Sequence, residues 1–201
     1  MENLYLIVGL GNPGAEYAQT RHNAGFMTLD RFAERRAAVW KREDKFQARL
    51  ARTRFEGRRL VLAEPRTFMN LSGVAVQAAV TFYKIAVSQL LVVVDDADLP
   101  WGEIRMRASG SSGGHHGLES IEQHLGTRDF SRVRIGIGRR SDGVREITDY
   151  VLGRFEQADM PLLKAILERA CNQIECWLTA GTAKAMNDFN GMINTPLVKE
   201  S

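Results

Sequence analysis

The chain has 201 residues, 44% of them hydrophobic and 25% charged, a composition that suits one globular domain with a sizeable core. No segment is long and apolar enough for a membrane span, and no basic and apolar leader precedes the first predicted strand, so we expect a cytoplasmic protein. The formal net charge of +3 permits an anionic partner without requiring one. Cys171 and Cys176 have no His or Cys neighbours at ligand spacing, so we interpret both as packing residues.

The first predicted element is a buried strand at residues 4–8, an apolar run that breaks into a loop of glycine and proline. A helix is predicted over residues 23–36, because apolar residues recur there at helical spacing. Residues 46–55 and 58–64 flank Glu56-Gly57, a pattern typical of a β-hairpin.

The rest of the chain alternates strands with helices, and the hairpin adds antiparallel pairing. This pattern predicts an α/β fold, a single-domain sandwich in which helices flank both faces of a twisted mixed β-sheet. We place the domain at residues 1–190 and treat residues 191–201 as a C-terminal tail. The predicted elements are helices at 71–84, 115–125 and 157–179, strands at 90–94, 104–107 and 132–137, and a polar, mobile segment at 142–153.

Gly9, Gly11 and Gly14 match the G-x-G-x-x-G pattern of dinucleotide sites, and a strand precedes them. In that motif the third glycine packs inside an opening helix. Here Pro13 disfavours helical angles at the residue before it, and the loop reads as a turn. A nucleotide-cofactor oxidoreductase is therefore the weaker interpretation, and we expect no dinucleotide and no other cofactor.

Polar side chains gather where predicted strands end, in loops that begin at Asn12, Phe68, Asp95 and Ser109. The carboxyl ends of parallel strands meet at one rim of a doubly wound sheet, so these loops should converge with His22. Each loop also has a structural interpretation. Asn12 could serve only its turn, and Asn70 could cap the next helix. The glycine-rich loop at 109–117 resembles a phosphate cradle but lacks its G-K-[ST] ending.

Taken together, these loops offer a base in His22, a carboxylate to orient it in Asp95, and amides in Asn12 and Asn70 to hold a carbonyl group or a water. We interpret no serine as the nucleophile of a G-x-S-x-G elbow, and neither cysteine lies in a predicted loop. A base that activates water directly suits an ester better than an amide. We therefore expect an esterase site without a metal.

Six short strings follow one another along the chain: Val-Gly-Leu-Gly-Asn-Pro-Gly at 8–14, Thr-Arg-His-Asn-Ala-Gly at 20–25, Thr-Phe-Met-Asn-Leu-Ser-Gly at 67–73, Asp-Asp-Ala-Asp-Leu-Pro at 95–100, Gly-Gly-His at 113–115 and Arg-Ile-Gly-Ile-Gly at 134–138. In this order and spacing they resemble bacterial peptidyl-tRNA hydrolase, from Leu4 to about Phe189. The resemblance implies a cytoplasmic esterase that cleaves peptidyl-tRNA into peptide and tRNA and recycles tRNA from stalled translation.

Carried onto this chain, the resemblance makes His22 the catalytic base and Asp95 the acid that keeps it basic. Asn12 would distinguish N-blocked from free aminoacyl-tRNA. The resemblance places Tyr17, Phe68 and Asn70 against the tRNA end, Met69 at the crevice wall, and a lid around residues 142–153. We add His115 and His116 of the glycine-rich loop to the substrate-binding set. The expected partner is the acceptor stem and 3′ end of peptidyl-tRNA, bound by a monomer.

His116 departs from the family pattern, which has asparagine after Gly-Gly-His. Histidine is bulkier and titrates near neutrality, so the contact that the asparagine makes to water and RNA is in question. The departure leaves open an RNA-binding family member that does not hydrolyse its ligand.

Basic residues alternate with apolar ones at residues 104–107 and 132–135, so the arginines of each strand share one face. We predict that Arg105, Arg107 and Arg134 form an RNA-binding face, although a solvated sheet face would show the same pattern. The pairs Arg35-Arg36 and Arg58-Arg59 are predicted to be solvated.

Overall fold

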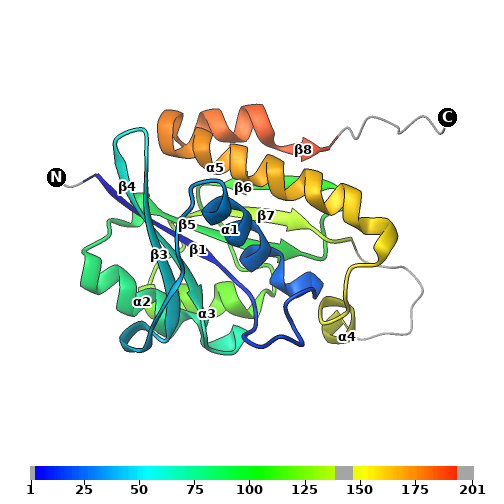
Figure 1. Cartoon of the computed structure of the whole chain (residues 1–201), viewed down its shortest axis with the longest axis horizontal. Helices are drawn as coiled ribbons and strands as arrows, with labels where there is room; N and C mark the ends of the chain where they lie inside the picture. Colours follow the sequence, from blue (N-terminus) through cyan, green and yellow to red (C-terminus); the bar gives the residue numbers. More distant parts are fainter. Residues whose placement is uncertain (1–2, 139–146, 194–201) are drawn as a thin grey trace.

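The computed structural model describes residues 3–138 and 147–193, in which one eight-stranded sheet lies between two layers of helices (Figure 1). The strands are β1 (Leu4–Gly9), β2 (Lys41–Glu43), β3 (Ala48–Phe55), β4 (Arg58–Pro65), β5 (Leu90–Asp96), β6 (Glu103–Arg107), β7 (Ser131–Gly136) and β8 (Gly191–Met192). The α-helices are α1 (Ala24–Glu34), α2 (Ser72–Tyr83), α3 (His116–Leu125), α4 (Ile147–Val151) and α5 (Met160–Phe189).

The sheet has the strand order β2-β3-β4-β1-β5-β7-β6-β8. Its centre is parallel, because β1 pairs in parallel with β4 and β5, and β5 pairs in parallel with β7. Both edges are antiparallel, with β2 and β3 at one side and β6 and β8 at the other. The predicted α/β sandwich with a mixed sheet is confirmed.

The central strands are buried on both faces, which explains why β5 is apolar from Leu90 to Val94 rather than alternating. Helices α1 and α5 cover one face, where they pack over Ile7, Leu91 and Val93. Helices α2 and α3 cover the other face, where Val8 and Val92 lie. This alternation of side chains between the two faces is the period of two expected for strands.

The hairpin forms where it was predicted, and Glu56 and Gly57 both adopt positive φ angles, 45° and 74°. Two positive φ angles are typical of the tight turn that matches the twist of paired strands. The first strand of the hairpin begins two residues later than predicted, since Phe46 lies in a 3₁₀ turn.

The C-terminal half departs from the prediction in two places. Helix α5 continues ten residues past the predicted end at 179, with a break in helical geometry at Gly181. Two residues of the expected tail, Gly191 and Met192, form β8 and pair with β6. Of the expected mobile segment 142–153, residues 142–146 lie outside the described residues, while Ile147–Val151 form α4.

Three arginines predicted to lie on open surface have buried or paired positions instead. Arg132 is fully buried, and its guanidinium donates to the carbonyl oxygens of Gly110 and Arg128. Arg35 and Arg36 form ion pairs with glutamates of α5, so they connect α1 to α5. Within the described parts of the chain, no helix is long and apolar enough to cross a membrane.

Candidate active site

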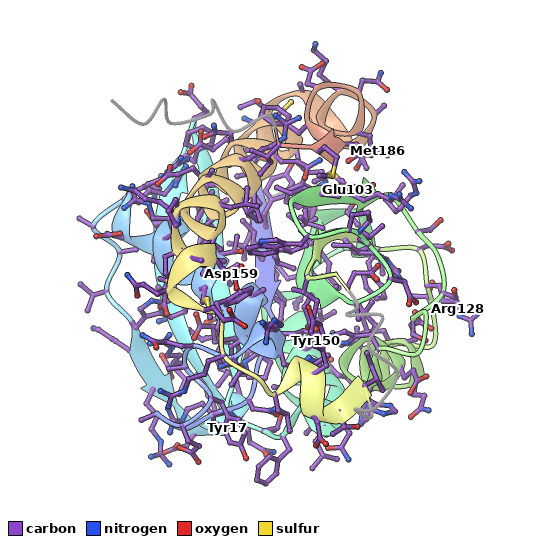
Figure 2. The ribbon with its side chains drawn as sticks, turned by 90° about the vertical axis from the view of Figure 1, so that its right-hand side faces the viewer. Tyr17, Glu103, Arg128, Tyr150, Asp159 and Met186 are labelled. Carbon is purple, nitrogen blue, oxygen red and sulfur yellow. The ribbon has the colours of Figure 1, made fainter. Side chains whose placement is uncertain are left out.

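The loops that carry the predicted polar residues meet at the carboxyl ends of the parallel strands. This edge is the side of the molecule where α4 lies in Figure 1, and it faces the viewer in Figure 2. In open α/β sheets this edge is where ligands bind. A cavity of about 370 Å³ opens here, lined by Asn12, His22, Asp95, His115, His116 and Arg134 among others.

Asp95 lies at the end of β5 and is shared by two imidazoles. Its carboxylate oxygens lie 2.9 and 3.0 Å from Nδ1 of His22, and Oδ1 lies 3.0 Å from Nε2 of His115. Burial by itself raises the pKa of Asp95, but the two imidazoles outweigh burial and hold the pKa well below its usual range. Asp95 therefore remains a carboxylate at neutral pH and accepts hydrogen bonds from both rings.

His115 has its tautomer set by the start of α3, where it is the N-cap residue. Its Nδ1 accepts hydrogen bonds from the backbone N–H groups of Gly117 and Leu118, at 3.2 and 3.4 Å. An imidazole nitrogen that accepts cannot carry a proton, so the proton of neutral His115 is on Nε2, which donates to Asp95.

His22 is oriented in the opposite sense. Its Nδ1–H donates to Asp95, which leaves Nε2 with a lone pair in a ring that lines the cavity. Among the described residues, no hydrogen-bond partner occupies Nε2 of His22. This arrangement is the one a general base requires.

Two glycines bring His22 to Asp95, because they let the start of α1 approach the ends of β1 and β5. A Cβ on Gly9 would lie 2.4 Å from the carbonyl oxygen of Gly25, and a Cβ on Gly25 would lie 2.4 Å from that of Val93. Neither position has space for a side chain. Gly9 and Gly25 thus allow close contact between helix and sheet. Gly14, the third glycine of the G-x-G-x-x-G pattern, lies in a loop rather than in a helix.

Asn12 is buried and held on both sides. Its backbone N–H donates to Oδ1 of Asn23 at 2.9 Å, and its carbonyl accepts from Nδ2 of Asn23 at 3.0 Å. Its side-chain Oδ1 accepts from the N–H of Met69 at 3.0 Å. The amide Nδ2 of Asn12 is therefore the group left to donate a hydrogen bond at the cavity.

The other predicted contacts lie around the cavity rather than in its lining. Met69 is buried and acts through its backbone, while Phe68 and Asn70 are exposed beside it. Asn70 does not cap α2, whose N-terminus has no side-chain cap. Tyr17 is half-buried in the loop after β1, at the lower edge of the view in Figure 2.

The predicted basic residues are only partly available to a ligand. Arg134 lies in the cavity wall and pairs with Asp96 at 3.0 Å, and Arg105 pairs with Glu103 at 2.6 Å. Arg107 is exposed, and its guanidinium donates only to the neighbouring carbonyl of Met106 in the described residues. The three arginines on this face of β6 and β7 therefore differ in how far neighbouring acids neutralise their charge.

His22, Asp95 and His115 place three potential metal-ligand atoms within 4.8 Å of one another. Zinc would require a lone pair on Nε2 of His115, which would move the proton of His115 to Nδ1. A proton on Nδ1 would point at the backbone N–H groups of Gly117 and Leu118, and the two hydrogen bonds that these groups now donate to Nδ1 would be lost. The hydrogen bonding therefore favours a carboxylate held between two imidazoles over a metal centre.

Three parts of the site were missed by sequence reasoning. Asn23, which holds Asn12, lies in a string that was singled out only for His22. Asp96 was noticed as part of an acidic run but was not assigned its pairing with Arg134. Helix α4 lies in the segment for which the resemblance implied a lid, but the apolar wall that it supplies to the cavity was not singled out from the sequence. The wall residues are Ile147, Val151 and Leu152.

Known proteins resemble this chain in sequence and in fold. A family described as Peptidyl-tRNA hydrolase matches residues 6–197. The chain is 47% identical over 185 residues to a peptidyl-tRNA hydrolase from Syntrophomonas wolfei, covering 92% of this chain and 99% of that protein. A relative of the same name from Desulfitobacterium hafniense is 46% identical over 92% of this chain and 98% of its own length. A crystal structure of peptidyl-tRNA hydrolase from Acinetobacter baumannii superposes with a TM-score of 0.88 at 38% identity, covering 96% of this chain and 97% of that one.

Proposed function

Because this chain belongs to the peptidyl-tRNA hydrolase family, it is an enzyme that hydrolyses peptidyl-tRNA, and we propose that His22, Asp95 and Asn12 carry the reaction in the cavity beside α4. The observation that supports this assignment best is that the Asp95 carboxylate accepts hydrogen bonds from two imidazoles. Because Nδ1 of His22 donates to Asp95, Nε2 of His22 keeps its lone pair and can accept a proton at the cavity. The substrate is the ester between the peptide carboxyl group and the terminal ribose of tRNA.

In the first step, Nε2 of His22 takes a proton from a water molecule as the water oxygen attacks the ester carbonyl carbon. The imidazolium that forms lies against the Asp95 carboxylate, which stabilises its positive charge. The amide Nδ2 of Asn12 donates to the substrate, either to the carbonyl oxygen that becomes negative or to the N-blocked amide beside it.

In the second step, the tetrahedral intermediate collapses and the bond from the carbonyl carbon to the ribose oxygen breaks. The proton on Nε2 of His22 passes to the leaving ribose oxygen, so the base is restored and free peptide and tRNA are released. A ribose hydroxyl is a far better leaving group than an amine, so a single imidazole with no covalent step suffices for the reaction.

The acceptor stem and 3′ end would lie over the exposed rim residues Phe68, Asn70 and His116, with phosphates toward Arg105, Arg107 and Arg134. Because peptidyl-tRNA is formed on ribosomes, we place the enzyme in the cytoplasm. We also expect it to act as a monomer. The alternative of an RNA-binding protein without hydrolysis is not favoured, because the change at His116 leaves the pairing of His22 and Asp95 intact.

The direct test is to incubate the purified protein with N-acetyl-aminoacyl-tRNA and, separately, with free aminoacyl-tRNA, and to measure tRNA release. We expect rapid release from the blocked substrate only. General-base help contributes about 10²- to 10⁴-fold, so His22→Ala should lose at least that order of kcat while still folding and binding tRNA. Asp95→Asn should lose less, because it changes orientation and charge but leaves the base. Near wild-type turnover by His22→Ala would contradict the assignment.

A further inference from the structure

The residue before the proposed base, Arg21, connects the catalytic turn to α4. Its guanidinium lies over the ring of Tyr150, 4.7 Å from the centroid, and 5.6 Å from the centroid of Phe155. Phe155 stacks on Trp101 with a centroid separation of 5.1 Å, and Oδ2 of Asp159 lies 4.0 Å from Nη2 of Arg21. Figure 2 shows Tyr150 on α4 and Asp159 before α5 on the same face of the molecule. Arg21 is thus the centre of an aromatic cluster.

The backbone reinforces this connection. The N–H of Arg21 donates to the carbonyl of Gly153 at 3.0 Å, and the N–H of Phe155 donates to the carbonyl of Gln19 at 3.3 Å. Thr20 and Arg154 form an antiparallel bridge between the same two segments. The segment that follows α4 is therefore paired with the three residues that precede His22.

Helix α4 depends on these contacts for its position. It has five residues, which is too short for a helix to be stable without tertiary contacts. Besides the cluster, the described contact that ties it to the sheet is the hydrogen bond from Tyr150 Oη to the carbonyl of Ile137, 2.7 Å long. Ile147 and Val151 of α4, together with Leu152 directly after it, line the catalytic cavity.

We propose that Arg21 is a positioning residue for substrate binding: it holds α4 as the aliphatic wall of the catalytic cavity and takes no part in proton transfer. This inference rests on the proposed function, because it assumes that the substrate binds in that cavity. Arg21 itself is not a substrate contact, since its side chain is only 12% exposed and its charge already faces two rings and a carboxylate. The wall contains no aromatic ring for stacking on a base, so it suits the aliphatic parts of the peptide.

The test compares Arg21→Met, which keeps the length of the side chain and removes its charge, with Arg154→Met as a matched control. Arg154 is exposed and lies in the same paired segment. Its bridge to Thr20 is made by the backbone, so replacing its side chain leaves the bridge in place. Loss of the cation–π contacts should raise KM for N-acetyl-aminoacyl-tRNA about 2- to 30-fold. We expect kcat and its pH profile to change by less than about twofold, and the control to behave as wild type.

Two further readouts separate positioning from other roles. The dependence of tRNA affinity on salt should be unchanged in Arg21→Met, since a lost phosphate contact would lower its slope. Hydrogen exchange of the backbone amides at residues 148–153 should become faster in Arg21→Met, while exchange in the central strands stays slow. Exchange is measured without substrate, so it tests the hold on α4 even if the protein proved inactive on peptidyl-tRNA.

A second variant covers the case in which Arg21→Met fails to fold. A Cβ on Gly153 would lie 2.8 Å from Nη1 of Arg21, so Gly153→Ala should displace the guanidinium from the α4 side. It should raise KM and speed exchange in α4 in the same direction. Unchanged KM and unchanged exchange in both variants would overturn the proposal. So would a fall in kcat with a shifted pH profile, or a lower salt slope.

Discussion

At the scale of single residues, the site depends on which nitrogen of each imidazole carries a proton. The N-terminus of α3 places the proton of His115 on Nε2, which donates to Asp95. The Asp95 carboxylate in turn places the proton of His22 on Nδ1. His115 is 8% exposed and contacts Asp95, so its predicted role against the RNA is replaced in our proposal by a role in orienting the carboxylate.

Replacing His115 should separate its two contacts. In His115→Asn the side chain still caps α3, but it is too short to reach Asp95. A hydrogen bond to a charged group is lost, so kcat/KM should fall roughly 10-fold with little change in stability. His115→Ala should lose the same activity and also about 1 kcal/mol of stability, because the cap is removed. Kinetics and urea unfolding of both variants check this, and equal stability of the two would show that the cap contributes little.

His116 is the residue at which this chain departs from its family, and it is 74% exposed with Nδ1 3.0 Å from Glu119. It lines the same cavity as His22. Histidine can carry a positive charge, whereas asparagine cannot, so the two side chains differ in the charge that they can bring to the cavity. The pH profile of kcat/KM should therefore differ between wild type and His116→Asn, and the variant should be active. Superimposable profiles would show that Glu119 or solvent screens the charge of His116.

At the scale of elements, one buried carboxyl group joins α1 to the hairpin. Glu64 on β4 is 1% exposed and contacts Nε of Arg49 on β3, and Arg49 also pairs with Asp30 of α1 at 2.8 Å. Oε1 of Glu64 has no hydrogen-bond partner in the described residues. Burial raises the pKa of Glu64 to about 8, Asp30 adds to the rise, and Arg49 opposes it.

This pKa makes stability depend on pH in a defined direction. The folded state holds the proton of Glu64 up to about pH 8, while the unfolded chain releases it near pH 4.5. The folded state therefore binds more protons between these values, and its stability should fall as pH rises through this window, by about 1–4 kcal/mol. Urea unfolding at pH 5 to 8 should show this fall in wild type, and Glu64→Gln should lack it. Parallel curves for the two proteins would contradict the prediction.

At the scale of the whole molecule, the arginines of β6 and β7 lie near the catalytic cavity, because β7 is the neighbour of β5, which carries Asp95. In the register of β6 and β7, Arg105 lies opposite Arg134 and Arg107 lies opposite Arg132. Of these four, Arg132 is buried in the protein, while Arg105 and Arg134 are paired with acids. Arg107 is therefore the one whose charge is least neutralised within the molecule.

We expect Arg107→Ala to lower the slope of log affinity for tRNA against log salt by about 0.7–0.9, the value for one phosphate contact. Arg42→Ala, on strand β2 at the opposite edge of the sheet, is the matched control and should leave the slope unchanged. Arg132→Ala should instead lower stability, because its buried hydrogen bonds and its contact with Phe130 are lost. An unchanged slope in Arg107→Ala would place the RNA-binding face elsewhere.

The sequence by itself determined the elements and the chemistry that they carry. Apolar runs with period two or 3.6, and glycine or proline at their ends, located the central strands and helices to within a few residues, apart from the C-terminal end of α5, because those patterns follow from local geometry. The same patterns indicated which loops follow strands, and so which polar residues, His22, Asp95 and Asn12, come together at one rim. The edge strands β2 and β8 carried no such pattern, because short exposed strands need no apolar face.

Only the tertiary structure decided how those residues are oriented and which charges are free. The proton positions on His22 and His115 depend on hydrogen bonds to residues up to 73 positions away, which no local pattern encodes. The same is true of Arg132, whose period-two position matches that of Arg134 although one is buried and the other reaches the cavity. The wall formed by α4 and its connection to Arg21 likewise arise from packing between distant segments, where contacts rather than residue type determine what each side chain does.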